Sequence, residues 1–90
     1  MDFANLIKAR EVLGSIWKES DLKGRCWGPT REDNPYVKSN ITLAIGEELI
    51  SVSQNQEGEL IIHEFVKTKG TSLGKTVRKI LLSAKLPVEN

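Results

Sequence analysis

The sequence has little of what catalytic and metal sites need. Its 90 residues include one cysteine, Cys26, and one histidine, His63. A structural zinc site takes about four Cys or His ligands, so that class of site is excluded, and we expect neither a metal nor a cofactor. A Ser-His-Asp or Cys-His arrangement would have to use His63, which lies in a stretch typical of a β-strand. We therefore expect a protein that is not an enzyme.

Long apolar runs are also missing. No stretch approaches the roughly 18 to 20 apolar residues that cross a bilayer. The chain opens with Met1-Asp2-Phe3, which places an acid where a signal peptide has basic residues. A lone cysteine cannot form an intramolecular disulfide, which favours a reducing compartment. The sequence predicts a cytoplasmic protein without a membrane-spanning helix.

The length allows one domain, which we place at residues 1–90. A chain of this size hides only about 60 to 65% of its unfolded surface and does not support two cores. Apolar residues recur three and four positions apart over 3–18 and again over 72–86. This spacing predicts two helices, each with one side facing the core.

The apolar pattern changes to alternation in the middle of the chain. It predicts three strands, over 36–45, 48–54 and 59–66. Because the links between them are short, consecutive strands are expected to pair antiparallel. The last strand has apolar side chains on both faces, which favours a central position in the sheet or one covered on two sides. The predicted fold is α+β in the order α-β-β-β-α, a three-stranded antiparallel meander with both helices packed on one face.

Residues 20–35 show neither period and are rich in polar residues, glycine and proline, which predicts a long loop. Long loops inside small domains are often functional. The loop and the residue after it therefore supply candidates for a partner-binding site: Arg25, Trp27, Arg31 and Tyr36. The alternative is that Trp27 folds back over the core.

Charge is distributed unevenly although the net charge is only +1. Residues 1–66 have a balance of −4, and residues 67–90 have a balance of +5. The basic residues of the second part are candidates for binding an anion or a nucleic acid: Lys67, Lys69, Lys75, Arg78, Lys79 and Lys85. Such an asymmetry is typical of contact with nucleic acid or an anionic surface. The alternative is that the basic helix complements an acidic sheet or the dipole of its own C-terminus.

The entry to the last helix, Gly70-Thr71-Ser72-Leu73-Gly74-Lys75-Thr76, is one residue shorter than a P-loop. The P-loop needs four residues between its glycines, so we do not expect nucleotide hydrolysis. Backbone N–H groups at a helix start, together with a hydroxyl and a lysine, still favour a bound anion. A phosphate of a nucleic-acid backbone would suit such a site, and a plain helix cap is the alternative.

The element order and the lysines around Gly70 resemble the double-stranded-RNA-binding domain, in which lysines at the start of the last helix lie across phosphates. The chain lacks the Gly-Pro-x-His loop and the Lys-Lys-x-Ala-Lys run of that family. The segment Ile62-His63-Glu64-Phe65, followed by Lys69 to Leu73, resembles the single-stranded-DNA-binding transcription coactivators, which begin with strands rather than a helix. Neither resemblance covers the whole chain, and neither assigns it to a family.

Two functions follow from these observations. The first is a small accessory or inhibitor protein that acts by protein contact, which the short chain and the loop residues of types enriched in interface hot spots favour. The second is a nucleic-acid-binding module that uses the basic face of the last helix. We favour the first because a net charge of +1 is low for a dedicated nucleic-acid binder. A three-stranded sheet also has two edges, and pairing of two copies at one edge would give a homodimer.

Overall fold

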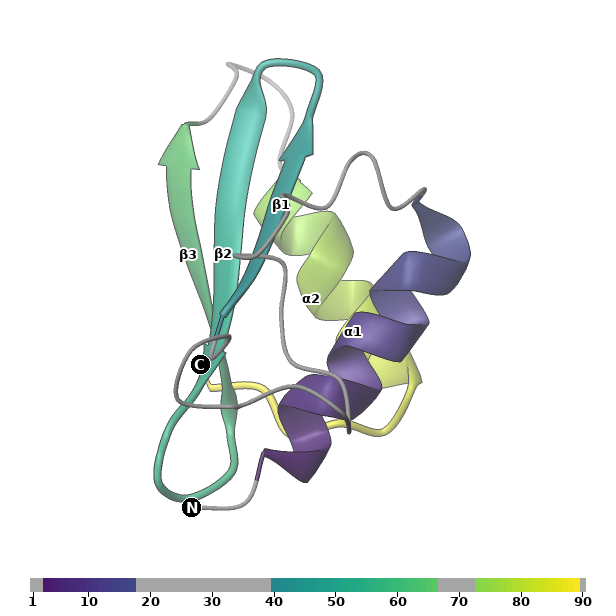
Figure 1. Cartoon of the computed structure of the whole chain (residues 1–90), viewed down its shortest axis with the longest axis vertical. Helices are drawn as coiled ribbons and strands as arrows, with labels where there is room; N and C mark the ends of the chain where they lie inside the picture. Colours follow the sequence, from purple (N-terminus) through teal and green to yellow (C-terminus); the bar gives the residue numbers. More distant parts are fainter. Residues whose placement is uncertain (1–2, 18–39, 67–72, 90) are drawn as a thin grey trace.

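A computed structural model describes residues 3–17, 40–66 and 73–89 (Figure 1). In these ranges the chain forms two helices and three strands: α1 (Ala4–Ile16), β1 (Ile41–Ile45), β2 (Glu48–Gln54), β3 (Leu60–Val66) and α2 (Leu73–Ser83). The predicted α+β fold and its order are confirmed. The loop predicted over 20–35 and the first part of the strand predicted over 36–45 lie outside the described residues.

The strands form an antiparallel meander in the order β1-β2-β3. Ile45 pairs with Glu48, so a two-residue turn, Gly46-Glu47, joins β1 to β2. Gly46 has a φ of 60°, a conformation that costs other residues energy and that glycine adopts freely. The turn therefore holds the register that puts Leu43 opposite Ile50.

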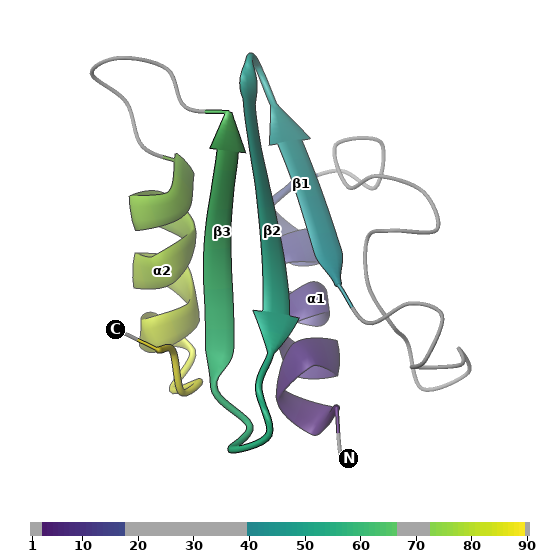
Figure 2. The ribbon, with the colours of Figure 1, turned by 90° about the vertical axis from the view of Figure 1, so that its left-hand side faces the viewer.

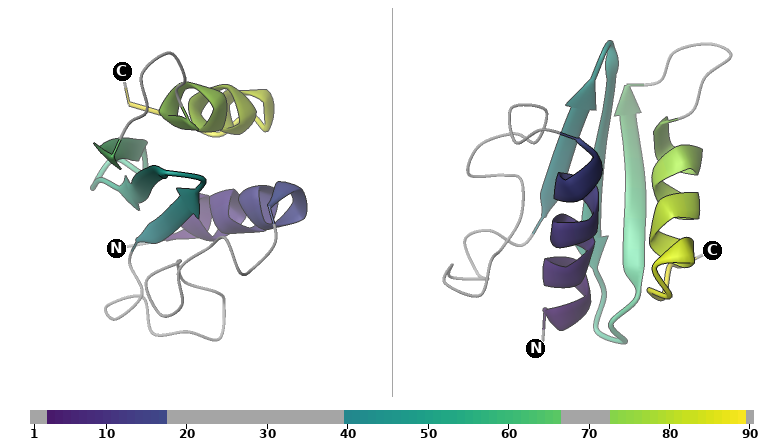
Figure 3. Two further views of the ribbon diagram at one scale, coloured as in Figure 1. Left: turned by 90° about the horizontal axis from the view of Figure 1, so that it is seen from above. Right: turned by 90° about the vertical axis from the view of Figure 1, so that its right-hand side faces the viewer.

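Both helices lie on one face of the sheet, which we call the inner face (Figure 3). Alternate residues of each strand point to that face and form the core with the apolar sides of the helices. The largest fully buried side chains come from all five elements: Leu6, Leu13, Ile41, Leu43, Ile50, Val52, Leu60, Val77 and Leu81. The core thus lies between the sheet and the two helices.

The central strand β2 also caps both helices. Its inner-facing row starts at Glu48 and ends at Gln54, and these two polar side chains reach the helix starts. The side-chain Oε1 of Gln54 accepts a hydrogen bond from the backbone N–H of Leu6 at 3.0 Å. Oε1 of Glu48 accepts one from the N–H of Leu73 at 3.3 Å. Free N–H groups at a helix start need such acceptors.

The prediction that the last strand is central in the sheet or covered on two sides was wrong. Within the described residues, β3 lies at the edge of the sheet, and its second half is exposed. Phe65 is 66% exposed and Val66 is 49% exposed. Apolar residues on both faces of a strand are typical of a strand that is buried on both faces. The sequence pattern does not show whether another element covers the outer face.

The chain leaves α2 through a Schellman motif. The N–H of Leu86 bonds to the C=O of Leu81 at 3.1 Å, and the N–H of Lys85 bonds to the C=O of Leu82 at 2.9 Å. Lys85 has a φ of 63°, the left-handed conformation that this motif requires. The turn sends the last residues back to β3, where Val88 forms a parallel bridge with Leu60 (Figure 2).

Candidate binding surface

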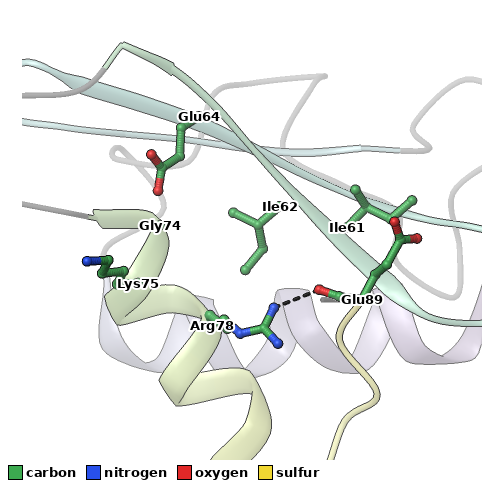
Figure 4. Close-up of a pocket in the computed structure, with 7 residues that line it drawn as sticks. All are labelled: Ile61, Ile62, Glu64, Gly74, Lys75, Arg78 and Glu89. Carbon is green, nitrogen blue, oxygen red and sulfur yellow. Dashed lines mark hydrogen bonds between the residues drawn. The ribbon is translucent and has the colours of Figure 1, made fainter.

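Helix α2 stands past the β3 edge of the sheet, whereas α1 lies behind β1 and β2 (Figures 2 and 3). A groove with a volume of about 370 Å³ lies between β3 and α2 (Figure 4). We call it the β3–α2 groove, and it is lined by Ile61, Ile62, Glu64, Gly74, Lys75, Arg78 and Glu89. Its floor is thus an exposed strand edge, and one of its walls is a helix.

Glu64 points from β3 toward the start of α2 (Figure 4). A side chain at Gly74 would overlap the carboxylate of Glu64, so the glycine makes this close approach possible. With Glu48 bonded to the N–H of Leu73, two carboxylates of the sheet lie at the N-terminal turn of α2. Negative charge is favourable there because the helix dipole is positive at its N-terminus.

The other end of the groove is closed by the C-terminal residues. Arg78 donates from Nη1 to the backbone C=O of Glu89 at 2.6 Å (Figure 4). The carboxylate of Glu89 in turn accepts a hydrogen bond from Nδ2 of Asn55 at 3.1 Å. The guanidinium of Arg78 is therefore turned toward the tail and is only half-exposed.

A second hollow, with a volume of about 380 Å³, adjoins the groove on the outer side of α2. We call this surface the cationic side of α2, and it consists of Lys75, Arg78, Lys79, Leu82 and Ser83. Lys75 and Lys79 are exposed, and Leu82 is 47% exposed. The surface combines positive charge with an apolar side chain.

The structure brings together three of the predicted basic residues: Lys75, Arg78 and Lys79. Lys85 is exposed but lies beyond the helix, in the Schellman turn, and lines neither the groove nor the hollow. The other predicted site residues lie outside the described residues: Lys67, Lys69, Arg25, Trp27, Arg31 and Tyr36. Their roles stay predictions.

The predicted anion site at the start of α2 has a competitor within the chain. The N–H of Leu73, one of the donors that a phosphate would use, already donates to Glu48. The carboxylate of Glu64 lies against Gly74 on the same turn. A bound phosphate would have to displace or face these two negative charges, which raises the free energy of its binding.

Five members of the groove were not among the predicted site residues: Ile61, Ile62, Glu64, Gly74 and Glu89. Glu64 follows Leu60 and Ile62 on the inner face of β3. An acid at a position where the alternation predicts a core residue could have marked Glu64 as a candidate site residue. For Ile62 and Glu89 the sequence carries no such signal, because their positions depend on which strand lies at the edge and on where the tail returns.

His63 lies exposed on the outer face of the sheet. Its Nε2 is 3.5 Å from Oγ of Ser53, and its ring stacks on Phe65 with ring centres 6.4 Å apart. Among the described residues, no three His, Cys, Asp or Glu side chains are grouped as a metal ion would require. The helices that the structure describes include none with the length and apolar character needed to cross a membrane.

No family model matches this sequence, and neither the curated proteins nor the solved structures contain a match to it.

Proposed function

We propose that this chain is a small non-enzymatic binding protein of the cytoplasm that acts as an accessory or inhibitor by protein contact. The binding surface is the β3–α2 groove together with the cationic side of α2. One observation carries the proposal: an exposed strand edge and an exposed mixture of apolar and cationic side chains meet at the same place. Strand edges and apolar patches rimmed by charge are typical of protein interfaces.

Exposed apolar residues on β3 and α2 support the proposal. Phe65 and Val66 form the end of β3, and Leu82 lies on α2 next to Lys79. Aromatic side chains contribute much of the binding energy in protein interfaces. A cytoplasmic location is supported by the lone cysteine, as the sequence predicts.

Nucleic-acid binding is the second candidate, and the gathering of Lys75, Arg78 and Lys79 favours it. The carboxylates at the start of α2 weigh against it, as does the bond of Arg78 to the tail. If the cations bind phosphates, the affinity falls steeply with salt concentration, with a slope close to one unit per neutralised phosphate.

A pull-down separates the two candidates. The full chain is immobilised and exposed to native lysate of the cell in which it acts, with and without nuclease. Protein partners that persist after nuclease treatment support protein contact. Loss of every partner on nuclease treatment, with direct binding of the purified chain to nucleic acid, would reject it in favour of the second candidate.

A further inference from the structure

The dimensions of the two layers leave room for a fourth strand. Neighbouring strands lie about 4.8 Å apart, and a helix with its side chains is about 10 to 12 Å wide, so two helices cover about four strands. Within the described residues the sheet has three strands. Because α2 stands past β3, the β3–α2 groove lies where the next strand of the sheet would lie (Figures 2 and 3).

The protein already pairs main chain at this edge. The N–H of Leu60 donates to the C=O of Pro87 at 2.9 Å, and the C=O of Leu60 accepts from the N–H of Glu89 at 2.8 Å. Backbone groups of alternate residues point to the same side of a strand. The N–H and C=O of Ile62 therefore point away from β2, into the groove. A segment that extends past Glu89 along β3 has Ile62 as its next pairing residue.

The charged side chains around the groove indicate which side chains such a segment has. Glu64 and Glu89 lie toward its two ends, and Lys75 and Arg78 line it from α2 (Figure 4). Every second side chain of an added strand faces α2. Lys79, which is exposed, lies with Lys75 and Arg78 on the cationic side of α2, so a carboxylate at such a position faces a positively charged helix. Opposite charges at this place select the partner more than they add affinity.

We propose that the β3–α2 groove binds an extended segment of a partner protein as a fourth strand, with an acidic side chain on the segment's α2-facing side. This inference rests on the proposed function, because it specifies which kind of protein segment the proposed binding surface binds. Hydrogen bonds with the main chain of Ile62 supply affinity, and the cations of α2 supply specificity.

A second copy of this chain fits the edge less well. Because α2 overlies the groove, two copies paired through β3 would have to place two α2 helices over the same edge (Figure 3). The bridge between Val88 and Leu60 also shortens the edge that a second β3 could use. A segment without a helix of its own over the strand avoids the first obstacle, and a short segment needs only the part of the edge that starts at Ile62.

The test uses peptides of known sequence. Linear peptides are selected from a random phage-displayed library against the immobilised full chain, synthesised with a fluorophore, and titrated by fluorescence anisotropy. We expect the selected peptides to be acidic and to alternate apolar residues with polar ones. The two variants that follow locate where they bind.

The first variant is Ile62→Pro, which removes the N–H that points into the groove. Proline is tolerated in edge strands where the N–H points away from the sheet. The control is Thr42→Pro at the opposite edge: the pairings of Val52 with Ile62 and Ile41 place the N–H of Thr42 away from β2. We expect about tenfold weaker peptide binding for Ile62→Pro, and no change for Thr42→Pro.

The second variant leaves the backbone intact and keeps the test valid if Ile62→Pro unfolds. Lys79→Glu reverses a charge on the cationic side of α2, and Lys8→Glu reverses an exposed lysine on α1. We expect about tenfold weaker binding of acidic peptides for Lys79→Glu, and unchanged binding for Lys8→Glu. Thermal melts followed by circular dichroism check that each variant is folded.

Peptides that bind a folded Ile62→Pro and Lys79→Glu as well as the parent chain overturn the assignment, while the proposed function stands with its surface elsewhere. A library that yields no peptide above background also overturns it. A third result would also overturn it: the chain dimerises as its concentration rises, and the Ile62 amide is protected from exchange without peptide. The β3 edge would then pair with a second copy of the chain. Failure of the proposed function is a separate result, because the nuclease pull-down would then yield no protein partner that persists after nuclease treatment.

Discussion

Replacing Lys85 with glycine should stabilise the fold. Lys85 occupies the left-handed position of the Schellman motif with a φ of 63°. The N–H groups of Lys85 and Leu86 close the motif at 2.9 and 3.1 Å, so the backbone cannot leave this conformation without losing both bonds. A residue with a Cβ is strained there, whereas glycine is not.

The strain of a non-glycine residue in this region is roughly 1 to 2 kcal/mol. Glycine has more conformational freedom in the unfolded chain, which offsets about 0.5 to 1 kcal/mol of that gain. We therefore expect Lys85→Gly to raise the free energy of unfolding by about 0.5 to 1 kcal/mol. For a domain of this size, that corresponds to a rise in Tm of about 4 °C.

Urea denaturation followed by circular dichroism measures the change. Lys85→Ala is the matched control, because it removes the same charge and keeps the strained φ, and we expect it to lie within about 0.5 kcal/mol of the parent chain. A Lys85→Gly chain that is no more stable than Lys85→Ala would refute the Schellman geometry. Because Lys85 lines neither the groove nor the hollow, neither change should alter peptide binding.

Two further substitutions test the caps and the core. Glu48→Gln keeps an acceptor for the N–H of Leu73 but removes the charge at the start of α2, so we expect a loss of about 0.5 to 1 kcal/mol in urea denaturation; a loss no larger than that of Glu47→Gln, in the exposed turn, would contradict the cap. Leu81→Ala empties a fully buried position and should cost about 2 to 5 kcal/mol, whereas Leu82→Ala, at a 47% exposed position, should cost under about 1 kcal/mol. Equal losses for the two leucines would show that α2 faces the sheet with a different side.

The sequence predicts the elements because burial imposes a period on them. The spacing of Leu73, Val77 and Leu81 places these three side chains on one side of a helix, and all three are buried against the sheet. The alternation of Ile41 and Leu43 likewise selects one face of β1. Local patterns suffice for such features because each depends on residues only a few positions apart.

The candidate surface depends on contacts between distant residues, which local patterns do not contain. Glu48 caps a helix that starts 25 residues later, and the tail returns to Leu60 only because Lys85 adopts a left-handed conformation. The basic residues of α2 are visible in the sequence, but the position of α2 past the β3 edge is not. The groove therefore could not be predicted, although the cations along its wall could.

Amide hydrogen exchange measured by NMR on the full chain tests the central claim, an open β3 edge, most directly. The N–H of Ile62 points into the groove, whereas by alternation the N–H of His63 points toward β2 and pairs with Ser51. We predict that the Ile62 amide exchanges at least about a hundredfold faster than the His63 amide. Equal protection of the two amides in the monomer would contradict the account, because the edge would then be covered by the chain itself.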